Sequence, residues 1–358
     1  MAVYLGTYFV ASVFSFCYSK SRDKFSGACF LMMTFVVLFA PLALRYNVGT
    51  DYKNYVRIVG NILNGRPYYK LEYGYFPIVW LMKRFDLDMQ IFFIVPAFIS
   101  ILIIFHVVPK KYFWFCIPAY VCVSWINSFS LVRQAFAAVI FLLAIKNHCE
   151  GKYFKALLWG LCAGMYHSSL FILLLLLPLT LLKWKVLNPY FNVMVFVLLC
   201  AFITLTPAAK ILMNSVVSLT PYARYIESIF AQQTEMGTGL GVMLKEFIFA
   251  LVLFFSVRDK SLQKDRRYNL ICIFTIAFGV SHMLATQIHI FGRMFHLFDP
   301  FYVCMLISLY EGRSKWKKWV ILFIQFSMFV IYFKLLKDNP SSAWGGLGLV
   351  PYESFLSK

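Results

Sequence analysis

The sequence has few charged residues for its length, and acidic residues are particularly scarce. Asp, Glu, Lys and Arg make up only 14% of the 358 residues, whereas 61% are hydrophobic and 19% are aromatic. No polar stretch is longer than roughly 45 residues, which leaves no room for a separate globular domain. The mean hydropathy of +0.74 is far above that of a soluble domain. We therefore predict an all-α polytopic membrane protein with a single transmembrane domain, residues 1–358.

Metal-site and nucleic-acid signals are also missing. The nine cysteines form no CxxC pair and show no metal-ligand spacing, so we expect no metal and no disulfide. The net charge of +19 comes from basic residues in short clusters between apolar runs. Clusters of this kind orient a membrane protein. We therefore expect neither a nucleic-acid partner nor a cofactor.

Apolar runs of about 15 to 20 residues recur along the chain and predict about twelve transmembrane helices. The expected spans are 2–19, 26–44, 89–108, 112–126, 128–145, 153–167, 169–182, 190–206, 241–257, 269–288, 294–311 and 319–334. If these spans cross the membrane alternately, more than half of the 34 Lys and Arg residues lie on one side of it. The positive-inside rule predicts that this side is cytoplasmic. The opposite side receives a first external loop at 45–88, a second at 207–240 and an external C-terminal tail at 335–358.

One segment of the first external loop, EYGYFPIVWLMKRF, is too short to span a membrane comfortably and ends near two basic residues. We predict a short re-entrant or interfacial helix near 73–85, held by its aromatic side chains at the depth of the lipid headgroups. If this segment does cross the membrane, the number of spans changes, so the expected range is 11–13.

Unusual polar residues gather on the external side of this threading. Arg133 is the least ordinary of them, because a guanidinium well inside an apolar helix costs about 3 kcal/mol on insertion scales. It should face a cavity or a phosphate. The others are Arg45, Asp51, Tyr52, Tyr55, Glu72 and Tyr73 in the first loop, Gln134 beside Arg133, His167 at a span end, Arg224 and Tyr225 in the second loop, and Arg293 after a late span.

Several of these residues also have ordinary structural explanations, and the sequence leaves both open. Arg45 lies at a helix end, from which its side chain could simply reach the interface. Asp51 follows a Gly-Thr pair and could only close that turn. His167 lies at a helix junction, and Arg224 could be a surface charge on an amphipathic helix. The tyrosines could all belong to the aromatic belt at the interface.

Several arginines with one or two carboxylates suit the transfer of a glycan from a lipid diphosphate. Arginine binds phosphate oxygens bidentately and stays charged. A carboxylate or an imidazole could deprotonate the attacking sugar hydroxyl. The residues expected in these roles are Arg45, Arg133, Arg224 and Arg293 for the diphosphate, Asp51, Glu72 and His167 for the base, and Tyr52, Tyr55, Tyr73, Gln134 and Tyr225 for other substrate contacts.

The order of these motifs resembles a known family. The chain contains RYNVGTDY from Arg45 followed by Tyr55, EYGY from Glu72, RQ at Arg133, HSSLFILL from His167 and the late Arg293. Together they are similar to the EpsG family of Wzy-type polysaccharide polymerases. The resemblance covers most of the chain, and the first motif is its most distinctive part.

The resemblance implies a GT-C-like glycosyltransferase membrane fold in the bacterial inner (cytoplasmic) membrane, with the active site on the periplasmic side. The implied enzyme is a metal-independent polymerase of O-antigen or capsule. It would transfer the growing glycan from undecaprenyl diphosphate to the non-reducing end of a lipid-linked repeat unit. The implied partners are undecaprenyl-diphosphate-linked oligosaccharides, membrane lipid and a chain-length regulator.

Two other functions use the same lipid-linked donor. An O-antigen ligase would move the glycan onto the lipid A core, but such ligases usually carry a large periplasmic loop between late spans, and the 207–240 loop is only moderately long. A flippase or transporter needs a polar path through the midplane, with broken helices or repeats. Here the polar residues gather at one face, which favours the polymerase.

Overall fold

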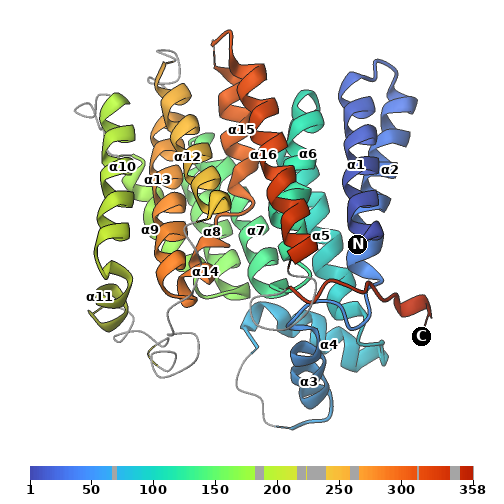
Figure 1. Ribbon diagram of the computed structural model, residues 1–358. Coiled ribbons are helices and arrows are strands. Elements are labelled where there is room, and N and C mark those ends of the chain that lie inside the picture. The colour runs from blue at the N-terminus through green and yellow to red at the C-terminus, as the bar shows by residue number, and fades with distance from the viewer. Residues whose placement is uncertain are drawn as a thin grey trace. The chain divides into compact units, whose positions relative to one another are not determined.

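The computed structural model of the chain is helical nearly throughout (Figure 1). It describes residues 1–66, 71–181, 189–215, 223, 239–258, 266–312, 314–338 and 347–357. Within these ranges the named elements are all helices, and an isolated β-bridge joins Arg45 and Ser354. The predicted all-α class is confirmed.

The chain forms two compact units. The first contains Met1–Leu174 and Gln325–Lys358, and the second contains Leu175–Ile324. Both boundaries lie inside helices, namely α9 (Leu170–Leu179) and α16 (Lys317–Asp338). The division is therefore not marked in the sequence by a polar linker.

The first unit is built around α7, whose small and branched apolar residues are buried along nearly its whole length. The helices α5 and α8 pack against α7, and α1 packs against α2 and α6. The helices of this unit are α1 (Ala2–Lys20), α2 (Lys24–Ala43), α3 (Tyr52–Leu63), α4 (Phe76–Phe85), α5 (Ile91–Val107), α6 (Phe113–Tyr120), α7 (Val132–Cys149) and α8 (Tyr153–Tyr166), with short helices η1 (Tyr73–Tyr75), η2 (Lys110–Tyr112) and the π-helix η3 (Val121–Trp125).

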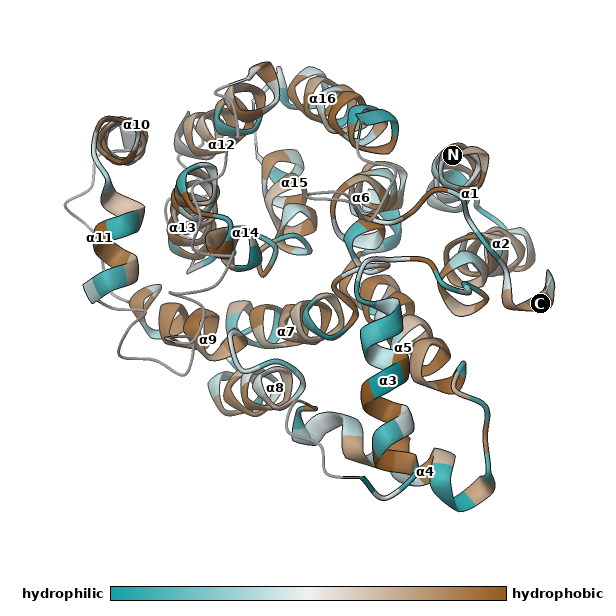
Figure 2. Cartoon of the chain, turned by 60° about the horizontal axis from the view of Figure 1, so that its bottom comes forward, coloured by the Kyte–Doolittle hydropathy of each residue, from teal (hydrophilic) through white to brown (hydrophobic). Residues whose placement is uncertain are grey.

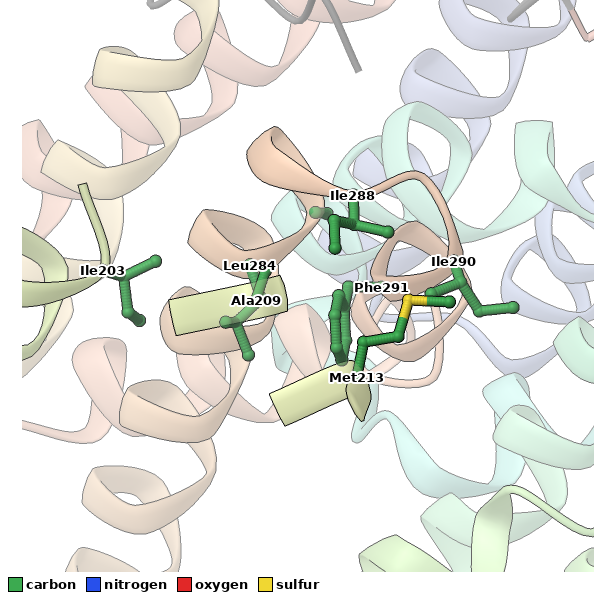
Figure 3. Packing of buried hydrophobic residues seen from close by; sticks show 8 residues of the cluster. Ile203, Ala209, Met213, Leu284, Ile288, Ile290 and Phe291 are labelled. Atoms are coloured by element: carbon green, nitrogen blue, oxygen red, sulfur yellow. The ribbon is translucent and has the colours of Figure 1, made fainter. Parts of the chain in front are cut away.

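The second unit packs α10, α12 and α13 against one another. Gln287 secures the sharp bend after α10, because its amide donates to the carbonyls of Ile203 and Thr206 and accepts from the Ala209 N–H. Apolar side chains of α11, α13 and α14 fill the space beside this bend (Figure 3). The helices are α10 (Pro189–Leu205), α11 (Ala208–Ser215), α12 (Leu240–Arg258), α13 (Arg266–Gln287), α14 (Ile290–Phe295) and α15 (Phe301–Glu311).

Within the described residues, five helices are long and apolar enough to cross a membrane, or up to seven if each of two bent pairs counts as one span. The chain is thus a multi-pass membrane protein, but the twelve predicted spans are not confirmed. Three of the expected spans form helices of only 14, 10 and 11 residues, namely α8, α9 and α15. The run that includes α6 bends by 101° from α5. Hydropathy records how apolar a run is, and it does not record whether the backbone stays in one straight helix.

The first predicted loop contains more helix than the sequence analysis expected. Its segment near 73–85 is helical as predicted, forming η1 and α4. A second helix, α3, was missed. It buries Tyr52, Tyr55, Ile58 and Val59 on one face, and Figure 2 shows hydrophilic and hydrophobic residues mixed along it. The spacing of these four residues was the signal of an amphipathic helix.

Candidate functional site

Arg45 joins the first motif to the turn that precedes α7. The residue is 2% exposed, and its guanidinium donates to the carbonyl oxygens of Ser128 at 3.1 Å and Phe129 at 2.8 Å. It also lies over the rings of Phe93 and Phe129, at 4.6 and 5.4 Å from their centroids. These contacts show how Arg45 positions the turn, while its predicted contact with a diphosphate stays a prediction.

The structure explains why the same motif contains a glycine, Gly49. Its φ is +99°, and a Cβ added there would lie 2.0 Å from the Phe129 carbonyl oxygen. Only glycine combines this backbone conformation with so close an approach. The motif is therefore built to lie directly on the turn that leads into α7.

The C-terminal segment, residues 347–357, binds the other side of the motif. Its backbone pairs with the chain just after α2, through Tyr46 N–H to Glu353 O at 2.9 Å, Gly49 N–H to Gly348 O at 2.8 Å, Thr50 N–H to Leu347 O at 3.2 Å and Phe355 N–H to Leu44 O at 2.7 Å. The Tyr4 hydroxyl also donates to the Leu349 carbonyl at 2.5 Å. The segment predicted as an external tail is thus a strap that holds the first motif.

Asp51 begins α3 at the N-cap position, without a hydrogen bond from its side chain to the first turn. The next residue, Tyr52, stacks on Phe93 with ring centroids 4.7 Å apart and planes 11° apart. Tyr55 is 2% exposed and packs near Phe92 and Phe93. Tyr52 and Tyr55 therefore support the site from inside, and Asp51 is half-buried at its edge.

Arg133 and Glu72 form an ion pair in the first unit. Their side chains are 18% and 22% exposed, so the pair is only partly open to solvent. Burial raises the pKa of the Glu72 carboxyl above its ordinary value, and the charge of Arg133 offsets part of this rise. A guanidinium and a carboxyl group are thus held together where little water reaches them.

Aromatic side chains surround this ion pair. The Arg133 guanidinium lies 5.4 Å from the centroid of Tyr55. Burial, and then the charge of Asp51, raise the pKa of the Tyr55 hydroxyl, while Arg133 lowers it. Tyr75 is fully buried and packs against Phe92. The pair thus has a rigid aromatic support and a neutral phenol beside it.

The end of α8 reaches the same region. A Cβ on Gly74 would meet the Tyr166 ring at 2.9 Å, so η1 lies directly on α8. The next residue, His167, ends the helix, and its Nδ1 lies 2.5 Å from the Ser169 hydroxyl oxygen. Tyr73, in the same short helix η1, is 76% exposed. Tyr73 therefore retains the open ring that stacking on a sugar requires.

The structure brings together a subset of the predicted site residues. Arg133, Glu72 and Tyr55 are in contact, with the buried Gln134 next to Arg133 in the chain. Arg224 and Tyr225 lie outside the described residues. Arg293 belongs to the second unit, on α14.

The start of α7 adds a favourable field for an anion. Arg133 is the second residue of this 18-residue helix, and the N-cap residue, Leu131, supplies no side-chain cap. The N–H groups of a first helical turn carry a partial positive charge that attracts phosphate. Arg133 and the helix terminus together place positive charge at the start of α7.

Around Arg293, the second unit collects further basic groups. Burial, and then the charges of Arg293 and His296, lower the pKa of His289. His296 Nδ1 lies 2.9 Å from the Asp299 carboxylate. Arg293 itself is half-buried on the short helix α14.

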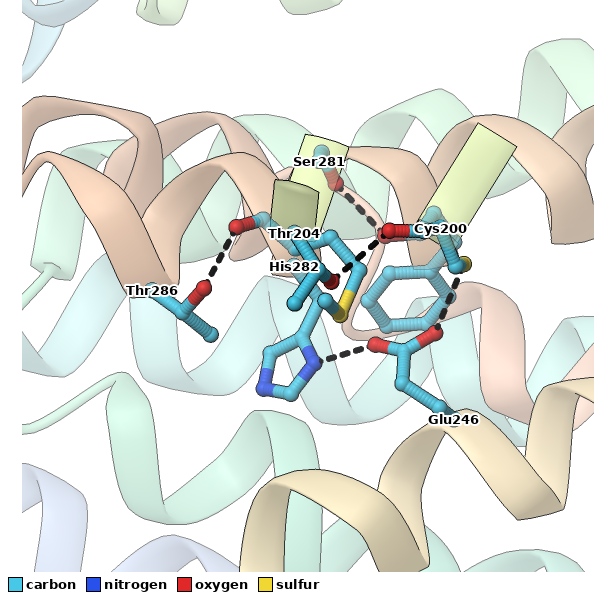
Figure 4. A network of polar contacts seen from close by, with 8 residues as sticks. Cys200, Thr204, Glu246, Ser281, His282 and Thr286 are labelled. Carbon is cyan, nitrogen blue, oxygen red and sulfur yellow. Dashed lines mark hydrogen bonds and ion pairs between the residues drawn. The ribbon is translucent and has the colours of Figure 1, made fainter. Parts of the chain in front are cut away.

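The second unit contains a buried acid and imidazole pair that was not predicted from the sequence. Glu246 on α12 and His282 on α13 are hydrogen-bonded at 2.6 Å (Figure 4). The signal in the sequence was the Lys245-Glu246 pair within an apolar run. As with Arg133, charged side chains inside an apolar helix are costly and therefore require an explanation. Across the described ranges, no three His, Cys, Asp or Glu side chains converge as metal ligands would.

A family model described as the EpsG family matches residues 28–354. No curated protein and no solved structure matches the chain. The matched range includes the first motif, Glu72, Arg133, His167 and Arg293.

Proposed function

Because the chain belongs to the EpsG family, whose members are Wzy-like polysaccharide polymerases, we propose that it is a glycosyltransferase that lengthens a lipid-linked glycan. The donor is the growing glycan on undecaprenyl diphosphate, and the acceptor is the non-reducing end of a lipid-linked repeat unit. The reaction takes place on the periplasmic side of the inner membrane. The diphosphate already activates the donor, so the chemistry requires neither a nucleotide sugar nor a metal.

The geometry that supports this function is the Arg133 and Glu72 pair at the start of α7. Arg133 supplies a guanidinium fork for the diphosphate oxygens, and the helix terminus adds a partial positive charge. Glu72 holds the guanidinium in place, as a carboxylate partner commonly does for an arginine fork. The exposed ring of Tyr73 offers a stacking surface for a sugar close to this pair.

The transfer itself breaks one bond and forms another. The acceptor hydroxyl oxygen attacks the anomeric carbon, the bond from that carbon to the diphosphate oxygen breaks, and undecaprenyl diphosphate leaves with the bonding electrons. Arg133 stabilises the charge that develops on the leaving diphosphate. A base must take the proton of the acceptor hydroxyl, and the first unit offers Asp51, Glu72 and His167 for this step.

Other proposed contacts and partners extend this account. Arg45 supports the first motif near the donor, and Arg293 and Arg224 are further phosphate-binding residues. A chain-length regulator in the same membrane sets the number of repeats.

Cells that lack the protein test the proposed function. A polymerase predicts that single-repeat glycans on lipid A replace the long chains. Long polymer left on undecaprenyl lipid would instead identify a ligase. Repeat units trapped on the cytoplasmic side would identify a flippase, and long chains still attached to lipid A, as in the wild type, would contradict all three functions.

A further inference from the structure

An apolar groove of about 450 Å³ lies between α9, α10 and α13 in the second unit. The helices α10 and α13 run side by side (Figure 1). The wall on α13 contains a stripe of four half-buried apolar residues, Ile273, Ile276, Ala277 and Val280. Their spacing puts them on one face of the helix. The described helices therefore leave part of this apolar face uncovered.

The polar groups of the groove lie together at one end. The Asn192 amide donates to the Tyr268 hydroxyl at 3.3 Å, and the Asn269 amide donates to the Thr180 carbonyl at 3.3 Å. Both contacts involve the first turn of α13. At a rise of 1.5 Å per residue, Val280 lies about 18 Å further along the helix than Tyr268. The groove is thus polar at one end and apolar along the rest of its length.

The shape of the groove fits a single hydrocarbon chain. A volume of about 450 Å³ spread over about 18 Å gives a mean cross-section of about 25 Å². An α-helix with its side chains is about 10–12 Å in diameter, so a helix of another protein or of a second copy is too wide to enter. Water does not fill an apolar cavity either. A flexible chain of methylene groups meets both conditions.

The polar end of the groove and Arg293 lie at opposite ends of α13. This helix has 22 residues, which at 1.5 Å per residue span about 33 Å, close to the hydrocarbon thickness of a bilayer. Asn192 contacts the start of α13, whereas Arg293 comes after its last residue, on α14. A lipid whose polar group reaches Asn192 therefore belongs to the opposite leaflet from a donor diphosphate at Arg293.

The sequence around the polar end carries an excess of positive charge. Residues 183–185, which follow α9, and residues 258–266, which precede Arg267, together contain six Lys or Arg residues and two Asp residues. Basic segments at a membrane surface attract anionic lipids. An acidic phospholipid therefore fits this end by charge, as its chain fits the groove by shape.

We propose that the groove binds one acyl chain of an acidic phospholipid, with the glycerol and phosphate groups at the Asn192 end. The chain covers the apolar stripe on α13, and the second unit is more stable when the lipid is bound. This binding requires no glycosyl transfer, so the inference goes beyond the proposed function.

The test uses purified full-length protein in detergent and phosphatidylglycerol that carries a photoreactive diazirine on one acyl chain. After illumination, peptide mapping should place cross-links between Ile273 and Val280. Ala277→Phe puts an aromatic ring into the groove, so cross-linking there should fall by about 10-fold or more. Added phosphatidylglycerol should raise the thermal unfolding midpoint of the wild type and not that of Ala277→Phe.

A matched control and two competitors complete the test. Ala201 is exposed on α10 and does not line the groove, so Ala201→Phe should be cross-linked like the wild type. Ala277→Leu replaces Ala277→Phe if that variant does not fold. Unlabelled phosphatidylglycerol should compete for the site more strongly than phosphatidylcholine or undecaprenyl phosphate does.

Three results would overturn the inference. Equal cross-linking of the wild type and a folded Ala277 variant would exclude the groove as the site. Equal competition by phosphatidylcholine would remove the requirement for an acidic lipid, and stronger competition by undecaprenyl phosphate would assign the groove to a polyprenyl chain. Ladder formation tests the proposed function separately, and its failure would leave the lipid site intact.

Discussion

Glu72, just before η1, forms an ion pair with Arg133 in the first turn of α7, although 61 positions separate them in the sequence. The pair is possible because the first motif lies on the turn before α7 and η1 lies on the end of α8. Three segments that are distant in sequence thereby build one partly buried site. The arginine places a positive charge at the start of α7, and the carboxyl group of Glu72 fixes its direction.

Glu72→Gln tests the protonation of this pair. Burial raises the pKa of Glu72 in the folded protein, so its contribution to stability is full below the unfolded pKa and is lost as the pH rises through the folded pKa. The unfolding midpoint of the wild type should therefore fall relative to that of Glu72→Gln between about pH 4 and pH 7. Glu311→Gln, in the exposed pair with Arg267, is the control. If the unfolding midpoint of the wild type instead rises relative to that of Glu72→Gln as the pH rises, the charge of Arg133 affects the pKa of Glu72 more strongly than burial does.

Asp51→Asn asks whether the first motif supplies the base. Asparagine is also a good turn and N-cap residue, and Asp51 makes no side-chain cap to α3, so the fold should be retained. If Asp51 only closes the turn before α3, ladder formation should stay within about threefold of the wild-type rate, because asparagine serves equally well there. Asp23→Asn, at the exposed N-cap of α2, is the matched control. A folded Asp51→Asn protein without activity would identify Asp51 as the base.

Gly49→Ala and Gly60→Ala form a pair with opposite expected outcomes. A Cβ at Gly49 would lie 2.0 Å from the Phe129 carbonyl, at a φ of +99°. This variant should unfold at lower temperature and lose activity. Gly60 is inside α3 with open space around it, so alanine there should stabilise the helix by about 0.5–1 kcal/mol. Equal unfolding midpoints for the two variants would contradict the described turn.

Tyr4→Phe tests the C-terminal strap. The change removes the donor to the buried Leu349 carbonyl, which should cost about 1–3 kcal/mol. Tyr8→Phe is the matched control on the same helix, because within the described residues the Tyr8 hydroxyl has no hydrogen-bond acceptor of this kind. Thermal unfolding in detergent gives both values. No difference between the two variants would show that the strap contributes little to stability.

Much of the helical class could be predicted from the sequence, because continuous apolar runs with few charges have almost no other stable form in lipid. The functional interest of Arg133 could also be predicted, since a guanidinium in an apolar helix requires a partner. Its partner could not be predicted, because the Glu72 contact depends on how η1 packs on α8. The length of each helix could not be predicted from hydropathy either, as the bends and short helices show.

Two signals were present in the sequence and were not used. The spacing of Tyr52, Tyr55 and Ile58 indicates the amphipathic helix α3. This helix was overlooked because the segment was predicted to be a loop. The charges of Lys245 and Glu246 inside an apolar run indicate a buried ionisable site, which the structure shows as the Glu246 and His282 pair. The roles of Arg45 were harder to separate, because its buried contacts with backbone carbonyls are visible only in the fold.

The most direct measurement compares ladder formation by purified wild type, Arg133→Ala, Arg133→Lys and Arg267→Ala with lipid-linked repeat units. Arg133→Ala loses the bidentate phosphate contact and leaves Glu72 without its ion pair, so its rate should fall by about 100-fold or more. Arg133→Lys should restore little, because an ammonium lacks the planar fork. Arg267→Ala breaks an exposed pair and should polymerise normally. A folded Arg133→Ala protein that forms ladders at the wild-type rate would contradict the phosphate site at the start of α7.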